Sequence, residues 1–214
     1  MYPFFKRLFC IIASGLGLII TSPIWLIAVI GIEVSDPGPV FYMANRVGKN
    51  NRVFKMFKFR SMTVDRSANE NSFKADVSRI FPFGDFMRRS KIDELPQLLN
   101  CFIGDMAIIG PRPASVDQTD ITRGGKYAAV SSVMPGLSGP SALYDYVYGD
   151  TIEDEDEYEK LVLPTRLELD LYYVNHVKAG FDLKMIWWTV VCIVRSVLGG
   201  SNEKILAALK AMVE

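Results

Sequence analysis

The longest hydrophobic stretch of the chain lies close to its start, from Leu8 to Ile32, and contains no charged residue. It directly follows the basic pair Lys6-Arg7. A run of this length is enough for a helix to cross a bilayer core of ~30 Å. It is too long for a cleavable signal peptide, and no small-residue cleavage site precedes a polar segment. The pattern therefore predicts a helix that enters a membrane.

The dipeptide Ser22-Pro23 stands near the centre of this run. Proline removes a backbone donor and bends or breaks a helix, and the hydroxyls of Thr21 and Ser22 can satisfy the freed carbonyls. Each half then has about fifteen residues at most, or ~22 Å of helix, so neither half spans alone. Two topologies follow: a kinked span, which the residues alone favour, and a re-entrant helix-break-helix that returns to the face it entered.

The pattern after the membrane segment predicts a few short strands. Two β-prone runs, residues 40–42 and 53–59, are joined by a Gly-Lys-Asn-Asn turn at 48–51, which is typical of a β-hairpin. Residues 106–109 form a short apolar run that we expect to be a buried strand.

Most of the remaining pattern has helical spacing. Residues 166–176 and 201–214 carry apolar side chains on one helical face. Residues 183–198 are apolar apart from Lys184 and Arg195, and they include two adjacent tryptophans. Such a helix suits the plane of a membrane interface, although an ordinary core helix has the same pattern. We therefore expect an α+β protein, mainly helical, with a re-entrant or spanning first helix, a short β-hairpin and amphipathic interfacial helices around a small domain.

Two adjacent carboxylates open another helical pattern at Asp93-Glu94-Leu95-Pro96-Gln97. Because proline is tolerated only in the first turn, we expect this helix to begin at about Asp93. The free N–H groups at a helix N-terminus favour ionised carboxylates and attract phosphate, which makes Asp93 a candidate anionic nucleophile. The simpler alternative is that Asp93 only caps the helix.

Cations surround this pair in the sequence. Arg88 precedes it, and Arg112 stands between Pro111 and Pro113, a rigid way to present a guanidinium to an anion. All charged residues between Asp36 and Asp65 are basic, namely Arg46, Lys49, Arg52, Lys55, Lys58 and Arg60. Such a patch is either a solvated face or a site for nucleic acid, anionic headgroups or a nucleotide diphosphate. Its position beside a membrane segment favours the last two ligands.

Composition excludes several classes of protein. Half of the 214 residues are hydrophobic, and 24 cations balance 24 anions, so no overall charge attracts nucleic acid. The three cysteines lie in apolar runs without CxxC spacing, which argues against disulfides and zinc and fits a reducing cytoplasmic setting. We expect the single histidine, His176, to have a structural or surface role and not a catalytic one.

Several motifs in fixed order carry a resemblance to a known family. They are Lys58-Phe59-Arg60-Ser61-Met62, Asp93-Glu94-Leu95-Pro96-Gln97, Gly104-Asp105-Met106, Gly110-Pro111-Arg112-Pro113 and Pro135-Gly136-Leu137-Ser138-Gly139. Over about residues 1–198 the chain resembles the bacterial sugar transferases, small monotopic phosphoglycosyl transferases that start glycoconjugate assembly.

The resemblance refines the expected organisation. We divide the chain into a membrane helix (1–34), a catalytic domain with interfacial helices (35–198) and a C-terminal amphipathic helix (199–214). Because similar proteins carry a Ser-Pro break here, the resemblance implies that the first segment is re-entrant. The protein is then expected in the bacterial plasma membrane, with its catalytic domain facing the cytoplasm and in contact with membrane lipids.

The resemblance also implies an activity: transfer of a sugar-1-phosphate from a nucleotide diphosphate sugar, expected to be UDP-linked, to an undecaprenyl-type polyprenyl phosphate. Asp93 would form a covalent aspartyl phosphosugar, with Mg2+ held by Asp93 and Glu94. Glu94 would bind the metal, orient Asp93 or assist the second step. The contrasting hypothesis is a non-catalytic membrane-anchored interaction protein that binds anionic lipid or recruits glycan-assembly enzymes.

Candidate phosphate ligands follow from the same motifs. Arg88 and Arg112, the latter with its flanking prolines, are the principal ones, followed by Lys58 and Arg60. Many family members carry an arginine soon after the PGxxG stretch, whereas this chain has an acidic insertion at 150–159. Arg166 is the candidate to replace that arginine.

Overall fold

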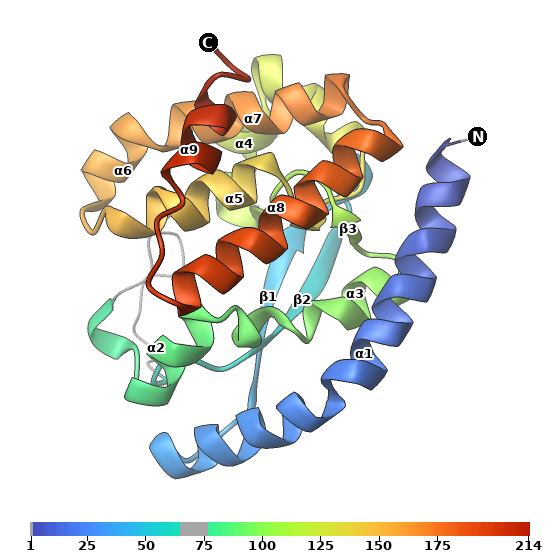
Figure 1. Ribbon diagram of the computed structural model, residues 1–214. Helices are drawn as coiled ribbons and strands as arrows, with labels where there is room; N and C mark the ends of the chain where they lie inside the picture. Colours follow the sequence, from blue (N-terminus) through green and yellow to red (C-terminus); the bar gives the residue numbers. More distant parts are fainter. Residues whose placement is uncertain (1, 65–76) are drawn as a thin grey trace.

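The computed structural model describes residues 2–64 and 77–214. Its helices and strands are α1 (Tyr2–Ser35), β1 (Phe41–Val47), β2 (Val53–Phe59), α2 (Pro82–Arg89), α3 (Gln97–Ile103), β3 (Ala107–Ile109), β4 (Ala114–Ser115), α4 (Thr119–Arg123), β5 (Gly136–Ser138), α5 (Pro140–Val147), α6 (Glu155–Leu161), α7 (Leu163–Asn175), α8 (Ala179–Val197) and α9 (Glu203–Lys210). Helices predominate, in agreement with the mainly helical α+β prediction (Figure 1).

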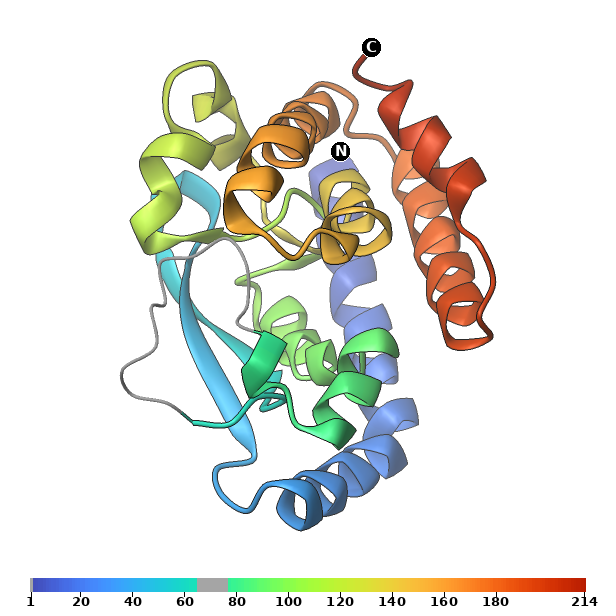
Figure 2. The same ribbon diagram turned by 90° about the vertical axis from the view of Figure 1, so that its left-hand side faces the viewer.

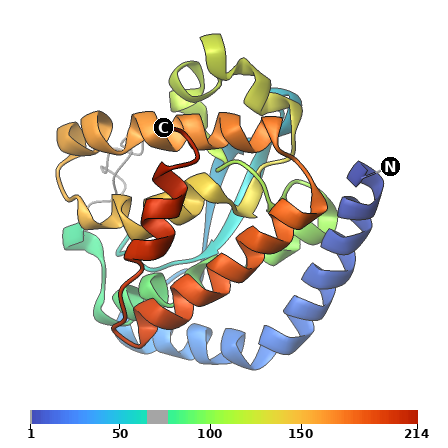
Figure 3. The same ribbon diagram turned by 45° about the horizontal axis from the view of Figure 1, so that its top comes forward.

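The first helix, α1, runs continuously through Pro23, so the predicted break is instead a bend. Figures 1 and 3 show its ribbon changing direction partway along. Pro23 cannot donate to the carbonyl of Ile19, and the Ser22 hydroxyl donates to that oxygen at 2.8 Å. The Thr21 hydroxyl donates in the same way to Gly17 O at 2.7 Å. The expected pairing with the freed carbonyl is therefore confirmed for Ser22, whereas Gly17 O is not a carbonyl that Pro23 frees. The re-entrant topology stays a prediction.

Most of the apolar surface of α1 is not covered by the rest of the chain. Only 11% of its most apolar 18-residue window is buried, and the helix is long and apolar enough to cross a membrane. A core helix of a soluble domain would be mostly buried, because exposed apolar area costs roughly 25 cal/mol per Å2 in water. α1 is therefore a membrane-associating helix.

The expected hairpin is present. β1 and β2 pair antiparallel from Phe41 opposite Phe59 to Val47 opposite Val53, and β4 joins the free edge of β1. β3, the strand expected over 106–109, pairs parallel with β5. In Figure 2 the hairpin lies on one side of the molecule, and α8 with α9 lies on the other.

The largest core gathers α5 to α9 around three fully buried tyrosines, Tyr144, Tyr158 and Tyr173. α8 is apolar on two faces: Met185 faces this core, whereas Trp187 is 66% exposed. α8 is thus a core helix with a second apolar face that the described residues leave uncovered. Its seat in a membrane interface stays a prediction.

Basic residues fasten the start of α1 to the rest of the chain. The ammonium of Lys6 lies 2.9 Å from Oδ2 of Asp182, on α8, and donates to the carbonyl of Ile109 at 2.7 Å. The guanidinium of Arg7 donates to two carbonyls at the end of α3, Cys101 O at 2.6 Å and Phe102 O at 2.8 Å. These cations therefore hold α1 against α3 and α8.

Arg60 does the same at the far end of α1. It is 5% exposed, forms an ion pair with Asp36 and donates to the carbonyl of Pro39 at 2.6 Å. We refer to Lys6, Arg7 and Arg60 together as the α1 clamp.

Candidate active site

A polar pocket opens where β2, β5, α5, α7 and the segment leading to β4 meet. Four of its described lining residues are cationic and one is acidic, and three more are polar and uncharged. They are Arg46, Lys58, Arg112 and Arg166, then Glu94, then Gln97, Ser115 and Gln118. This excess of positive charge suits a phosphate or diphosphate group. Of the residues predicted from sequence, the pocket brings together Lys58, Glu94, Arg112, Pro113 and Arg166.

The two adjacent carboxylates lie in a tight turn, which corrects the expected helix start. Lys91 has a left-handed backbone, φ 57°, and Ile92–Glu94 forms a 3-10 turn, while the α-helix begins at Gln97. Pro96 has no N–H to donate to the carbonyl of Ile92. The N–H of Leu95 donates to that carbonyl instead, at 3.1 Å. Asp93 is therefore not at an α-helix N-terminus, and the capping alternative is also wrong, since Pro96 is the N-cap residue of α3.

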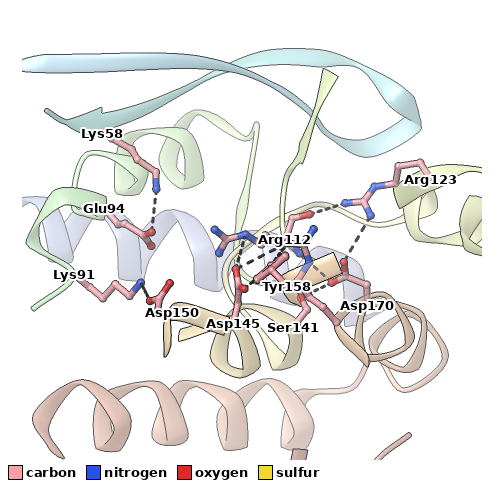
Figure 4. Close-up of polar contacts among 11 residues, drawn as sticks. Lys58, Lys91, Glu94, Arg112, Arg123, Ser141, Asp145, Asp150, Tyr158 and Asp170 are labelled. Carbon is pink, nitrogen blue, oxygen red and sulfur yellow. Dashed lines mark hydrogen bonds and ion pairs between the residues drawn. The ribbon is translucent and has the colours of Figure 1, made fainter. Parts of the chain in front are cut away.

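Glu94 is held as an anion by Lys58 of β2, whose ammonium donates to Oε1 at 3.0 Å (Figure 4). Burial opposes ionisation of Glu94, but Lys58, Lys91 and Arg112 together outweigh it and hold its pKa well below the usual range. Lys91 is in turn 3.9 Å from Oδ2 of Asp150. Glu94 is thus a fixed negative charge on the pocket wall.

Asp93 has the opposite environment. It is 5% exposed, and its Oδ1 is buried with no hydrogen-bond partner among the described residues. Burial raises the pKa of Asp93, and the charge of Glu94 adds to the rise, while Lys58, Lys91 and Arg88 oppose it. The sequence argument was that a helix dipole lowers the pKa of Asp93. The structure indicates the opposite direction, a raised pKa. What the turn provides is an unengaged carboxyl oxygen beside several cations.

The loop that carries Arg112 is fixed through its backbone. The N–H of Arg112 donates to Oδ1 of Asp170 at 3.1 Å, and Arg123 donates to the carbonyl of Arg112 at 2.6 Å. Arg123 and Asp170 are themselves an ion pair at 3.7 Å (Figure 4). The predicted rigidity of the Pro111-Arg112-Pro113 segment thus comes from this buried pair as well as from the prolines.

Close backbone packing explains the glycines of the two neighbouring motifs. Gly136 N donates to Pro111 O at 2.8 Å, and Gly110 N donates to Ser138 O at 2.9 Å. A Cβ atom at Gly136 would lie 2.1 Å from Gly110 N, which no side chain allows. The PGxxG stretch and the GPRP segment therefore form one unit that positions Arg112 above β5.

Arg166 reaches the pocket from α7, as the sequence suggested. Its Nη1 donates to the hydroxyl of Tyr158 at 2.6 Å and lies 4.0 Å from Oδ2 of Asp145. The same oxygen of Asp145 lies 3.4 Å from Nε of Arg112. Two pocket arginines thus share one buried carboxylate.

Two predicted phosphate ligands lie elsewhere. Arg60 belongs to the α1 clamp and does not line the pocket. Arg88 is on α2 next to the Asp93 turn; its Nη1 lies 3.9 Å from the sulfur of Met62, and its charge acts on Asp93.

Sequence reasoning missed several residues of the site. Gln97 lies inside the quoted Asp93–Gln97 motif and Arg46 inside the basic run, so both had a signal. Gln118 and Asp145 had none, because each stands in a segment without a recognisable pattern.

Comparison with known proteins identifies the family of this chain. The family model described as "Bacterial sugar transferase" matches residues 1–196, and the chain belongs to that family. It is 34% identical over 95% of its length to a UDP-N-acetylgalactosamine-undecaprenyl-phosphate N-acetylgalactosaminephosphotransferase of Aeromonas hydrophila, and the match spans 46% of that protein.

Two further relatives differ in length. The chain is 36% identical over 87% of its length to a UDP-glucose:undecaprenyl-phosphate glucose-1-phosphate transferase of Klebsiella pneumoniae, of which the match covers 39%. It is 34% identical, again over 87% of its length, to the exopolysaccharide production protein PSS of Rhizobium leguminosarum bv. phaseoli, with 93% of that protein covered. The chain thus spans less than half of the first two relatives and nearly all of the third.

Proposed function

We propose that this protein is a phosphoglycosyl transferase that moves a sugar-1-phosphate from a UDP-sugar to undecaprenyl phosphate or a similar polyprenyl phosphate. The names of the relatives from Aeromonas hydrophila and Klebsiella pneumoniae support both substrate classes. The observation that carries the proposal is the Asp93 carboxyl, buried and unengaged at Oδ1, beside a pocket lined by Lys58, Arg112 and Arg166.

The reaction is proposed to take two steps. In the first, an ionised Asp93 oxygen attacks the sugar-side phosphorus; an O–P bond forms to Asp93, and the bond to the second phosphate breaks, releasing UMP. In the second, the phosphate of the lipid attacks the same phosphorus and displaces the Asp93 carboxylate. Dividing the transfer lets one site meet a soluble and a lipid substrate in turn.

The neighbouring residues have defined tasks in this scheme. Arg112 and Arg166 hold the diphosphate and offset its charge, which is the main requirement in phosphoryl transfer. Lys58 holds Glu94 ionised and also favours the reactive anion of Asp93. Arg88 contributes the same effect from α2.

Two carboxylates of the site are the candidates to hold Mg2+. The described residues contain no group of three or more His, Cys, Asp or Glu side chains placed for a metal. Mg2+ bound through substrate phosphates needs only one or two carboxylates, and Asp93 and Glu94 are the residues that would hold it. When bound, the ion would screen charge on the diphosphate.

The membrane helix bears on where the reaction takes place. We propose that α1 is re-entrant in the plasma membrane and that the pocket faces the cytoplasm, where nucleotide sugars are made. The bend at Pro23 and the uncovered apolar surface of α1 and α8 support a monotopic arrangement, which keeps the pocket near the headgroups of the acceptor lipid.

The test uses full-length protein in phospholipid nanodiscs with a panel of UDP-sugars, Mg2+ and undecaprenyl phosphate. We expect UMP release with at least one donor, and a loss of about 1,000-fold or more in Asp93→Asn, because the amide is not a nucleophile. Asp156→Asn, the same change at an exposed position of α6, serves as the matched control. If Asp93→Asn releases UMP at the wild-type rate, the protein is an enzyme but Asp93 is not its nucleophile. If the wild type binds anionic lipid but turns over no UDP-sugar, the non-catalytic hypothesis is preferred.

A further inference from the structure

The acidic side chain at position 145 follows the PGxxG stretch closely in the sequence, yet it is buried and is not a solvated surface group. Asp145 lies on α5 with only 9% of its side chain exposed. Its Oδ2 is 3.4 Å from Nε of Arg112 and 4.0 Å from Nη1 of Arg166. In Figure 4 it lies directly against Arg112, with the Glu94–Lys58 pair beyond.

Tyr158 of α6 closes this contact into a ring. Its hydroxyl donates to Oδ1 of Asp145 at 2.6 Å and accepts from Nη1 of Arg166 at 2.6 Å. The chain beyond α5 packs tightly on the pair, because a Cβ at Gly149 would lie 2.2 Å from Oδ1 of Asp145. The carboxylate is therefore held on all sides by groups that are themselves fixed.

The ring leaves one edge of Arg112 for a ligand. Asp145 engages Nε, so the two terminal nitrogens of the guanidinium are directed away from the ion pair, and 38% of the Arg112 side chain is exposed. Two parallel N–H groups are the geometry that binds a phosphate in bidentate fashion. Arg112 and Arg166 also carry like charges, which the shared carboxylate offsets. Because a guanidinium stays protonated in proteins, its orientation, and not its ionisation, is the property that neighbouring residues adjust.

We propose that Asp145, oriented by Tyr158, is a positioning residue that aims Arg112 and Arg166 at the diphosphate of the nucleotide sugar. The inference rests on the proposed function, since it assigns the donor phosphates to this end of the pocket.

The first test is Asp145→Asn in the full-length protein in nanodiscs. We expect kcat/KM for the UDP-sugar to fall by about 10- to 100-fold, chiefly through a higher donor KM, because misplacement of a binding group by about 1 Å has effects of this size. The KM for polyprenyl phosphate stays within about twofold. Tyr158→Phe shows a smaller loss of the same kind. Asp156→Asn, the same change at an exposed position of α6, leaves all constants unchanged.

A double-mutant cycle separates positioning from a general structural role. If Asp145 acts through Arg112, then Asp145→Asn in an Arg112→Ala background adds a loss of threefold or less. If it merely stabilises the fold, its full loss multiplies with that of Arg112→Ala, and the proposal is overturned. Should Asp145→Asn fail to fold, Tyr158→Phe in the two backgrounds gives the same decision.

The outcomes also separate this inference from the function on which it rests. Wild-type turnover with an unaffected Asp145→Asn variant refutes the positioning role alone. A wild-type protein that neither binds nor turns over any UDP-sugar refutes both.

Discussion

Two groups of cations in this protein look alike in sequence and do different work in the structure. In the α1 clamp, Lys6, Arg7 and Arg60 all donate to backbone carbonyls, and Lys6 and Arg60 also pair with the carboxylates of Asp182 and Asp36. The pocket cations Arg112 and Arg166 are held from behind by one carboxylate and still line an open pocket. The two groups therefore differ in position: one fastens α1 to the rest of the chain, and the other lines the pocket.

One substitution in each group tests this comparison most sharply. Arg112→Lys removes the planar fork that binds phosphate, so we expect kcat/KM for the donor to fall about 100-fold with thermal stability unchanged. Arg60→Lys breaks contacts to Asp36 and Pro39, so we expect a loss of about 1–3 kcal/mol of unfolding free energy and a normal donor KM. Steady-state kinetics and chemical unfolding of both variants measure this. A raised donor KM in Arg60→Lys would contradict the separation of the α1 clamp from the pocket cations.

The two adjacent carboxylates allow a second comparison, in stability. Glu94→Gln leaves Lys58 without its partner and should lower the unfolding free energy by about 1–3 kcal/mol at pH 7. Because the pKa of Glu94 is lowered in the folded protein, this contribution is present above its ordinary value of 4.5 and is lost as the pH falls below it.

Asp93 should behave in the opposite sense. Its folded pKa is raised above the ordinary 3.8, so its ionised form destabilises the protein at neutral pH, and Asp93→Asn should be as stable as the wild type or more so. Unfolding curves from pH 4 to 8 check both signs. A destabilised Asp93→Asn with an unaffected Glu94→Gln would contradict the assignment of the paired and the unpaired carboxylate.

The comparison also shows what sequence could and could not predict. Periodicity and turn residues predicted the hairpin and the apolar helices because these depend on local pattern. The start of α3 was misplaced because a proline at position 96 is compatible with an α-helix from Asp93 and equally with a 3-10 turn before Gln97. Which of these forms depends on tertiary packing, and so does the raised pKa of Asp93.

Residue roles were hardest to predict where charge alone was the guide. Lys58 and Arg60 are two residues apart in one motif, yet one lines the pocket and the other clamps α1. Asp145 carried no signal, because a carboxylate becomes a partner of Arg112 and Arg166 only when α5 and α7 pack together. Sequence identified Arg112 of the GPRP motif, which lines the pocket, but not the carboxylate of Asp145 beside it.

The smallest expected effect concerns the bend of α1. Ser22→Ala removes the donor that replaces the missing N–H of Pro23, so we expect a loss of about 0.5–1 kcal/mol, seen as a fall of a few degrees in the unfolding midpoint in detergent. Ser22→Thr keeps a hydroxyl and should retain most of the stability. Equal midpoints for Ser22→Ala and the wild type would show that the carbonyl of Ile19 finds another partner.

The most direct test of the account is the mass of the protein after brief incubation with a competent UDP-sugar and Mg2+ in the absence of polyprenyl phosphate. We predict that the peptide containing Asp93 gains the mass of one sugar phosphate, that UMP appears in equal amount, and that added undecaprenyl phosphate removes the adduct. If the wild type turns over but no adduct forms on this peptide, or if an adduct forms on Glu94 instead, Asp93 is not the nucleophile.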